Sequence, residues 1–120
     1  MAQIQKFVKD KSFKPYQIKK TVEGATYQFV IGDLEGQEWY FSSPQEKECQ
    51  LNQEMKFLKE KIVKPGDIIL ECGTHHGWTT LLLSKWVGQI GQVIGFELNP
   101  KNAEIAQENM KINAIDNVTI

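Results

Sequence analysis

Two acidic residues flank a glycine-containing segment in the middle of the chain, LECGTHHGWT. Glu71 comes just before the pair Gly73 and Gly77, and Glu97 follows about 20 residues after the glycines, a common spacing in nucleotide-binding folds. Glycines at these places allow a sharp backbone turn and a close ligand, because a Cβ atom would intrude. A carboxylate at Glu97 can accept both hydrogens of a ribose diol, and Glu71 can bind an ammonium group directly or through water.

A helix that follows the glycines would add hydrogen-bond donors at the same place. The free N–H groups of a first helical turn carry a partial positive charge that suits a carboxylate. Thr79 and Thr80 can add hydroxyl donors. Together with the two acids, these groups predict a ligand with a ribose at one end and a zwitterionic amino acid at the other.

The elements around this segment are those of a doubly wound α/β fold. Ile68–Leu70 is a short apolar run, which we interpret as a strand buried on both faces, as in parallel sheets. Apolar residues at helical spacing then predict a helix from Trp78 to Val87. A second strand over Gln92–Leu98 precedes a helix that begins at Asn99, and a third strand begins at Val118. In such folds, ligands bind at the carboxyl ends of the strands.

The N-terminal part predicts a small β-rich module. Residues 1–24 could hold one or two short strands or a covering arm. From Tyr27 apolar residues alternate, and aromatic residues resume after Gly36, which indicates a β-hairpin with its turn near Leu34–Gly36.

A helix is predicted to join this module to the α/β unit. Ser43, Pro44 and Glu46 form a capping box with proline at the first helical position, and the helix ends before Pro65. We therefore divide the chain near residue 43, into an N-terminal β-rich module (1–42) and an α/β unit (43–120).

Composition excludes several function classes. The chain has 120 residues, 41% hydrophobic and 24% charged, as in soluble globular proteins. The net charge is −1 without a basic stripe, so we expect no nucleic-acid partner. No apolar run reaches the roughly 20 residues that span a bilayer, and no signal peptide is recognisable, so we expect a cytoplasmic protein without membrane contact. Cys49 and Cys72 are expected to be reduced, with Cys72 buried.

On these motifs, the run from about Val63 to Ile120 resembles class I S-adenosylmethionine-dependent methyltransferases, and within them the FkbM-like family. His75 stands where that family usually has Asn, and Leu98 where it often has Pro. The residues that match the first motif are Glu71, Gly73, Thr74, Gly77 and Thr79, and those that match the second are Glu97, Leu98 and Asn99.

The resemblance implies S-adenosylmethionine as cofactor, held by these residues together with His75. It also implies a Rossmann-like sheet of seven strands, of which the chain holds the first three. We therefore expect the N-terminal portion of a longer enzyme, which transfers methyl to oxygen of a small molecule or sugar, and a 120-residue chain that is inactive alone. No catalytic base can be named from the sequence.

Several alternatives remain open. A nicotinamide-dependent dehydrogenase would prefer G-x-G-x-x-G to the observed G-x-x-x-G. A non-catalytic assembly module could use the exposed edge of strand Ile68–Leu70 to form a homo-oligomer. His75 and His76 are expected to fill the loop and not to bind a metal, because no further ligands are near in sequence. Trp39–Phe41 could form an acceptor platform or part of the hairpin core, and Glu97 could be a surface acid.

Overall fold

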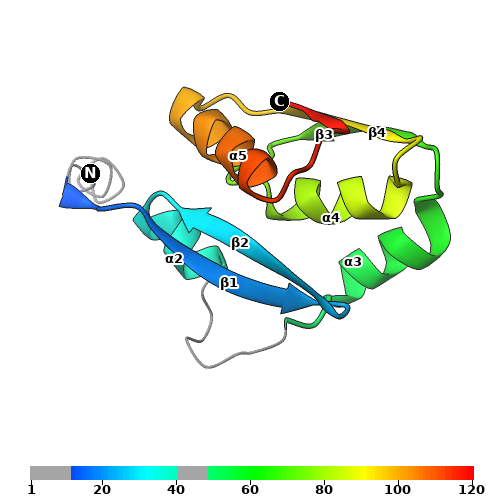
Figure 1. Cartoon of the computed structure of the whole chain (residues 1–120), viewed down its shortest axis with the longest axis horizontal. Coiled ribbons are helices and arrows are strands. Elements are labelled where there is room, and N and C mark those ends of the chain that lie inside the picture. Colours follow the sequence, from blue (N-terminus) through cyan, green and yellow to red (C-terminus); the bar gives the residue numbers. More distant parts are fainter. Residues whose placement is uncertain (1–11, 41–48) are drawn as a thin grey trace.

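The computed structural model describes residues 12–40 and 49–120 of the chain. Its strands and helices follow one another as shown in Figure 1. In order they are β1 (Tyr16–Val22), β2 (Ala25–Ile31), α2 (Leu34–Tyr40), α3 (Gln53–Phe57), the π-helical turn η2 (Leu58–Ile62), β3 (Ile68–Cys72), α4 (Trp78–Val87), β4 (Gln92–Phe96), α5 (Pro100–Ile112) and β5 (Val118–Thr119).

The elements form three layers. Strands β3, β4 and β5 make a parallel sheet in that order, and β1 and β2 make a separate antiparallel ribbon. Helices α4 and α5 lie between the sheet and the ribbon (Figure 1). Helix α4 contacts β3 and β4, while α5 contacts β2. The prediction of an α/β fold with a parallel sheet and a small hairpin is therefore confirmed.

Helix α4 begins and ends where the sequence predicts, and α5 begins where it predicts. Gly77 precedes α4 with φ +87°, and Gly88 ends it with φ +69°. Before α5, the side chain of Asn99 accepts a hydrogen bond from the backbone N–H of Lys101 at 3.0 Å, and Pro100 is the first helical residue. These local signals fix the two helices that frame the predicted site.

Two asparagines, Asn109 of α5 and its C-cap residue Asn113, complete the free edge of β2. Asn109 Oδ1 accepts the N–H of Val30 at 2.6 Å, and its Nδ2 donates to the Val30 carbonyl at 3.2 Å. One helical turn later, Asn113 makes the same pair of bonds to Gln28, at 3.0 and 2.7 Å. Two side chains four residues apart along the helix thus reach two backbone positions that are two residues apart along the strand. The side-chain amides replace a third strand and join the ribbon to the α/β unit.

The predicted hairpin turn at Leu34–Gly36 is wrong. The hairpin lies earlier, between β1 and β2, with its turn at Glu23 and Gly24, and residues 34–40 form helix α2. Asp33 explains the difference, because its Oδ1 accepts the N–H of Gly36 at 2.7 Å and so caps the first turn of α2.

The predicted helix start at Ser43 lies outside the described residues. Residues 49–52 are not helical, and α3 begins at Gln53 with Asn52 as its cap, whose Oδ1 accepts the N–H of Met55 at 2.8 Å. The predicted end before Pro65 is confirmed. The domain boundary near residue 43 stays a prediction.

The apolar run of β3 predicted a strand buried on both faces, and this prediction is wrong because one face is exposed. Ile68 and Leu70 are 68% and 66% exposed, while Ile69 between them is partly buried and packs with α4 residues. No element in the described ranges covers the outer face of the sheet, which explains the exposure. Cys72 shares this face and is also exposed, so its predicted burial is wrong.

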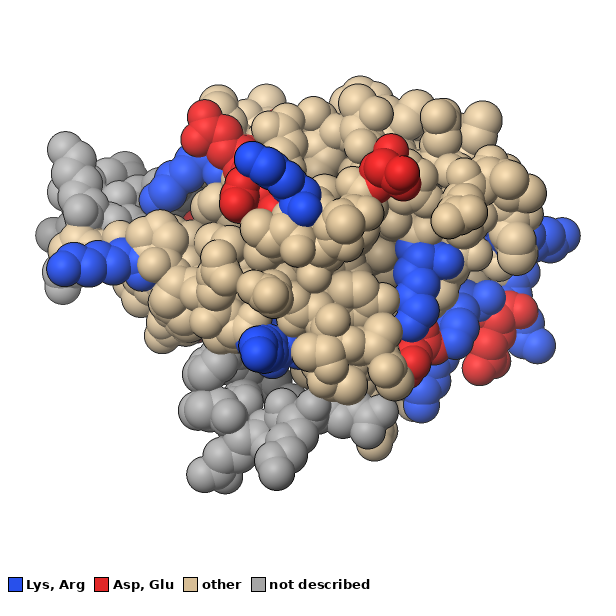
Figure 2. All heavy atoms as spheres, in the orientation of Figure 1, with Lys and Arg blue, Asp and Glu red and all other residues tan. Residues whose placement is uncertain are grey.

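Charged side chains on one side of the molecule lie mainly toward its ends, around a broad uncharged centre (Figure 2). Every helix within the described ranges is too short or too polar to cross a lipid bilayer.

Candidate functional site

The loop from Gly73 to Gly77 joins β3 to α4 and lies across the carboxyl end of β4. The N–H groups of Gly73 and Thr74 donate to the carbonyl of Phe96, at 2.7 and 3.3 Å. Gly77 N–H donates to the Thr74 carbonyl at 2.8 Å, which closes the turn. Both glycines have positive φ, +84° and +87°, a conformation that other residues rarely adopt. The predicted glycine-hinged bend between strand and helix is present.

The two glycines of the loop differ in their surroundings. Gly77 is closely packed, which leaves little space for a side chain, and Gly73 faces open space. A Cβ on Gly77 would lie 3.0 Å from Met110 Cε and 3.3 Å from Ala106 Cβ, so α5 approaches the loop closely here. A Cβ on Gly73 would meet nothing within 4 Å. The space over Gly73 is therefore open for a ligand.

Glu97 lies immediately after β4 and holds the loop in place. Its Oε2 accepts the N–H of His75 at 2.7 Å, and its Oε1 accepts the N–H of Asn99 at 2.9 Å. Each carboxylate oxygen has a further lone pair, so the group can still accept hydrogen bonds from a diol. The structure thus gives Glu97 a positioning role that the sequence analysis did not anticipate.

Glu71 lies at the same edge of the sheet as Glu97. It pairs in register with Gly95, two residues before Glu97, because β3 and β4 are parallel. Its Oε2 accepts a hydrogen bond from the Thr80 hydroxyl at 2.5 Å. Burial raises the pKa of Glu71, although the Thr80 hydrogen bond acts in the opposite direction. The two acids therefore lie at the same edge of the sheet, on either side of the glycine loop in the sequence, as the motif predicts.

The remaining predicted residues take different positions around this edge. Thr74 is buried, and its hydroxyl oxygen has no hydrogen-bond partner. Thr79 is half-buried in the first turn of α4. Leu98 is 97% exposed beyond the end of β4, while Asn99 caps α5. The role of each of these residues in ligand binding stays a prediction.

Two residues of the N-terminal part reach the loop: Asp33, which the sequence did not indicate, and Tyr40, which was considered only as part of an acceptor platform or of the hairpin core. The Tyr40 hydroxyl lies 3.0 Å from His75 Nδ1, and Asp33 Oδ2 lies 3.6 Å from His76 Nε2. The signal that could have indicated them is the Asp33 cap, which starts α2 and directs Tyr40 toward the loop. Burial lowers the pKa of His76 to about 4, with the neighbouring His75 acting in the same direction, so its ring is neutral at pH 7.

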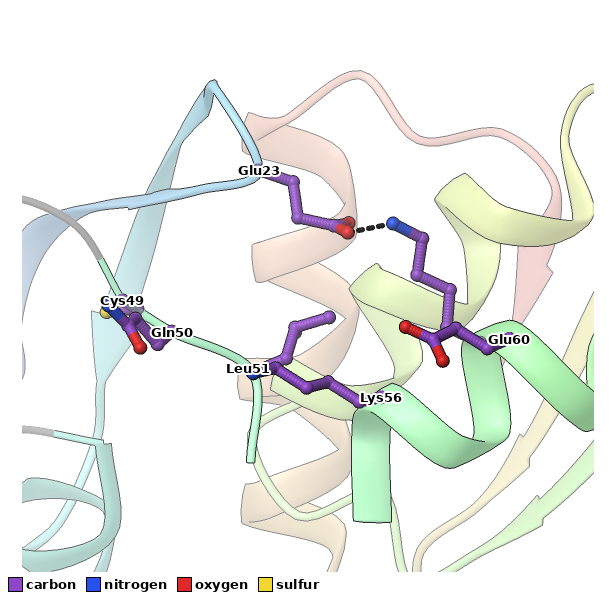
Figure 3. Close-up of a pocket in the computed structure, with 7 residues that line it drawn as sticks. Glu23, Cys49, Gln50, Leu51, Lys56 and Glu60 are labelled. Atoms are coloured by element: carbon purple, nitrogen blue, oxygen red, sulfur yellow. Dashed lines mark hydrogen bonds and ion pairs between the residues drawn. The ribbon is translucent and has the colours of Figure 1, made fainter. Parts of the chain in front are cut away.

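A surface cavity of about 280 Å³ lies elsewhere, between the β1–β2 turn and the α3–η2 segment (Figure 3). Glu23 and Lys59 form an ion pair at its wall. None of the predicted site residues lines it, so we place the site at the loop.

Comparison with known proteins indicates the family of the chain. The sequence profile of the family described as protein-L-isoaspartate(D-aspartate) O-methyltransferase matches residues 6–120. The chain is therefore related to class I S-adenosylmethionine-dependent methyltransferases over nearly its whole length. The finer resemblance to the FkbM-like family rests on the two motifs alone and stays a prediction.

Individual relatives act on different acceptors. Over 58 residues the chain is 34% identical to protein-L-isoaspartate O-methyltransferase of Fervidobacterium nodosum, covering 48% of this chain and 29% of that protein. Over 54 residues it is 35% identical to tRNA (adenine(57)-N(1)/adenine(58)-N(1))-methyltransferase of Methanocaldococcus jannaschii, covering 44% and 19%. A solved SAM-dependent methyltransferase of Aquifex aeolicus superposes with a TM-score of 0.53 at 31% identity, covering 57% and 36%.

These comparisons imply S-adenosylmethionine as the cofactor. The residues around the loop fit it, because Gly73 borders open space, the Thr74 hydroxyl oxygen lacks a partner and the carboxylates of Glu71 and Glu97 lie at the same edge of the sheet. The chain spans less than a third of the two curated relatives named above.

Proposed function

Because the chain belongs to the protein-L-isoaspartate(D-aspartate) O-methyltransferase family, we propose that it is the cofactor-binding N-terminal part of a methyltransferase. The observation that carries the proposal is the position of Glu71 and Glu97 at the same edge of the sheet, on either side of the Gly73–Gly77 loop in the sequence. Ligands of doubly wound folds bind at this edge.

Each part of the loop has a proposed task in holding S-adenosylmethionine. Glu97 would accept the ribose hydroxyls with the lone pairs that His75 and Asn99 leave free. Glu71 would bind the ammonium group, directly or through water, with the carboxylate oxygen that Thr80 does not occupy. The first turn of α4 would face the carboxylate of the cofactor.

The cofactor supplies a methyl group that is already activated on a sulfonium. The protein then has to hold an acceptor oxygen in line with the methyl–sulfur bond, and this positioning accounts for most of the acceleration. The oxygen forms a bond to the methyl carbon as the carbon–sulfur bond breaks, and the sulfur keeps that electron pair. No residue of this chain is assigned as a catalytic base.

For the acceptor, we propose an oxygen of an isoaspartyl or D-aspartyl residue in a protein, which is the acceptor in the family description. The sequence analysis favoured a small molecule or a sugar, and neither relative named above is a sugar methyltransferase. An acceptor would approach over Trp39, which is 61% exposed and whose ring centroid lies 4.8 Å from that of His75. The alternative that Trp39–Phe41 belongs to the hairpin core is wrong for Trp39 and Tyr40, because both lie in helix α2. Phe41 lies outside the described residues.

Methyl transfer to peptides by the full-length protein tests this proposal. Labelled S-adenosylmethionine would be supplied with an isoaspartyl peptide, the matched aspartyl peptide and a panel of sugars. We expect base-labile methyl esters on the isoaspartyl peptide and none on the aspartyl peptide. Transfer to a sugar hydroxyl would refute the proposed acceptor, and no cofactor binding would refute the function itself.

Two other functions would give different results in the same preparations. Competition by NAD against S-adenosylhomocysteine would favour a dehydrogenase. A discrete, stable dimer that binds neither nucleotide would favour an assembly module that pairs through the open edge of β3.

A further inference from the structure

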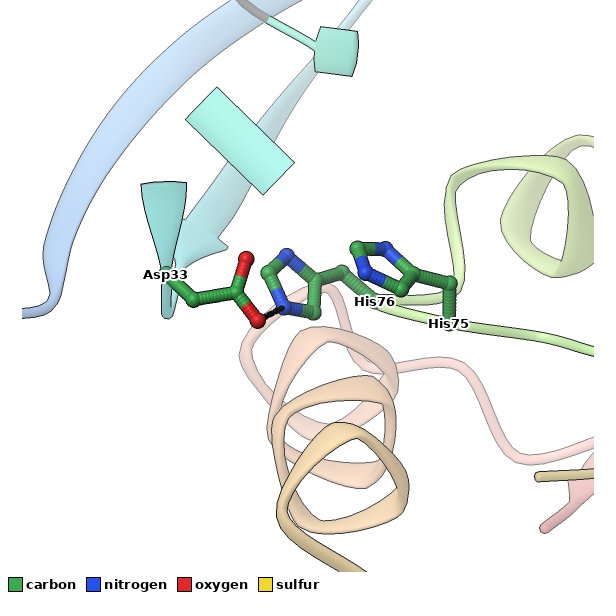
Figure 4. A group of neighbouring side chains, drawn as sticks. All are labelled: Asp33, His75 and His76. Atoms are coloured by element: carbon green, nitrogen blue, oxygen red, sulfur yellow. Dashed lines mark ion pairs between the residues drawn. The ribbon is translucent and has the colours of Figure 1, made fainter. Parts of the chain in front are cut away.

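Asp33, His75 and His76 form a buried cluster of side chains from two distant segments (Figure 4). One candidate ligand atom from each residue lies within 4.8 Å of the others, and His76 Nε2 lies 3.6 Å from Asp33 Oδ2. We propose that these three side chains bind a divalent transition-metal ion of the Zn²⁺ type. This proposal does not depend on the methyltransferase function.

The hydrogen bonds around the cluster leave the right atoms free. Asp33 Oδ1 accepts the Gly36 N–H at 2.7 Å, which leaves Oδ2 facing the histidines. His75 Nδ1 contacts the Tyr40 hydroxyl at 3.0 Å, while His75 Nε2 and both ring nitrogens of His76 are buried without a hydrogen-bond partner. Buried polar atoms rarely stay unpaired in proteins, so these nitrogens call for a partner.

The composition and geometry of the cluster suit an ion of this kind. Neutral imidazoles with one carboxylate are common zinc ligands, and ligating histidines usually have a hydrogen-bonded partner on the other nitrogen, as His75 has in Tyr40. Tetrahedral bonds of about 2.0–2.2 Å place ligand atoms about 3.3–3.6 Å apart. The Asp33–His76 pair is already near this separation at 3.6 Å.

The His75 ring has to rotate for the third bond. It now stacks on the His76 ring, with the ring centroids 4.1 Å apart. The candidate ligand atoms, which lie within 4.8 Å of one another, also have to move closer together. For the fourth position the candidate is Asn102 of α5, whose buried Oδ1 has no hydrogen-bond partner. An ordered water with the same polar neighbours is the competing occupant.

Occupation of this site would connect the N-terminal part to the candidate cofactor loop. Asp33 lies between β2 and α2, whereas His75 and His76 belong to the Gly73–Gly77 loop. His75 also donates its backbone N–H to Glu97. An ion here would therefore fix the loop that Glu97 contacts.

The test is Zn²⁺ binding by the chelator-treated chain, measured by competition with a chromophoric chelator, with Co²⁺ absorption as a second readout. We expect one ion per chain and a rise in the melting temperature. Asp33→Asn should lower the affinity by at least about tenfold, because loss of a hydrogen-bond partner of a ligand already costs about that much. This variant keeps the α2 cap, because the Asn oxygen can accept the Gly36 N–H, and unchanged circular dichroism would confirm its fold.

Two further variants complete the test. Cys72→Ser removes an exposed thiol that could bind Zn²⁺ by itself, and it should leave the affinity unchanged. His76→Gln should weaken binding as Asp33→Asn does. The proposal is overturned if the wild-type chain binds no ion, which would indicate water at the cluster. It is also overturned if both ligand variants bind like wild type or if Cys72→Ser abolishes binding.

Discussion

Glu71 is the residue at which stability and ligand binding oppose each other. Burial raises its pKa in the folded chain above the value in the unfolded chain. The folded state therefore binds the proton more tightly, and the stability that this contributes is present below the unfolded pKa and is lost as the pH rises through the folded pKa. At neutral pH the buried carboxylate is a cost that an ammonium ligand would offset.

The substitution Glu71→Gln tests this balance. We expect the variant to be more stable than wild type at pH 7 and to lose this advantage below about pH 4, where the wild-type carboxyl is also protonated. The Gln oxygen can still accept the Thr80 hydrogen bond. Urea unfolding at several pH values measures the difference. A variant that is less stable than wild type at pH 7 would contradict this account.

Asn109 is the residue on which the junction between ribbon and helix depends. It is fully buried and bonds to Val30 at two atoms and to the His76 carbonyl at 2.8 Å. Asn109→Ala leaves these backbone groups unpaired, so we expect a loss of about 2–3 kcal/mol in the free energy of unfolding.

Asn113→Ala is the matched control for this prediction. Asn113 makes the same bonds to Gln28, but at a site that water can reach. We expect its loss to be at most about 1 kcal/mol. Equal losses in the two variants, measured by urea unfolding, would show that burial is not the deciding factor.

At the scale of elements, helix α2 depends on contact with the glycine loop. A Cβ on Gly36 would lie 2.2 Å from His76 Cε1 and 2.4 Å from His76 Nδ1. Alanine favours helix over glycine by about 1 kcal/mol. His76 is fully buried and the two distances lie well below van der Waals contact, so the collision should outweigh the helix preference.

We therefore expect Gly36→Ala to lower the free energy of unfolding by about 1–3 kcal/mol, the range for overpacked cores. The control is Glu35→Ala on the exposed side of the same turn, where the change should be about 0.5 kcal/mol or less. Thermal unfolding followed by circular dichroism measures both variants. A stabilised Gly36→Ala would mean that α2 does not pack against His76 as described.

The sequence predicted best the elements that carry their own boundary signals. Gly77, Gly88 and Asn99 mark the ends of α4 and the start of α5, and these residues act locally. Helix α2 was missed because its cap, Asp33, lies among residues that also suit a turn. The cluster of Asp33 with His76 could not be predicted, because it depends on how the ribbon packs against α5.

At the scale of the whole molecule, the outer face of the parallel sheet is the main departure from the sequence analysis. An apolar run predicts a strand that is buried on both faces, but each face of a sheet is buried only if another helix or sheet packs on it. Within the described ranges, β3 is an edge strand of its sheet, and Ile68, Leu70 and Phe96 are exposed on that sheet. We propose that the 120-residue chain, studied by itself, self-associates through this open apolar face.

Leu70→Lys tests that proposal. A lysine at this place should keep the fold, since the side chain is exposed, and should lower self-association of the 120-residue chain. Sedimentation velocity over a range of concentrations measures the change in self-association. The comparison variant is Lys85→Leu, which makes the reverse substitution, lysine to leucine, on the opposite side of the sheet. A wild-type chain that stays monomeric at high concentration would contradict the proposal.

The account as a whole depends on a cofactor site at the carboxyl ends of β3 and β4. The most direct test is a titration of the ¹⁵N-labelled chain with S-adenosylhomocysteine, followed by amide chemical shifts, which detects even weak binding. The account predicts shifts at Gly73, His75 and Leu98, and their loss in Glu97→Ala. Shifts confined to the cavity beside Glu23 and Lys59, or no shifts at saturating ligand, would contradict it.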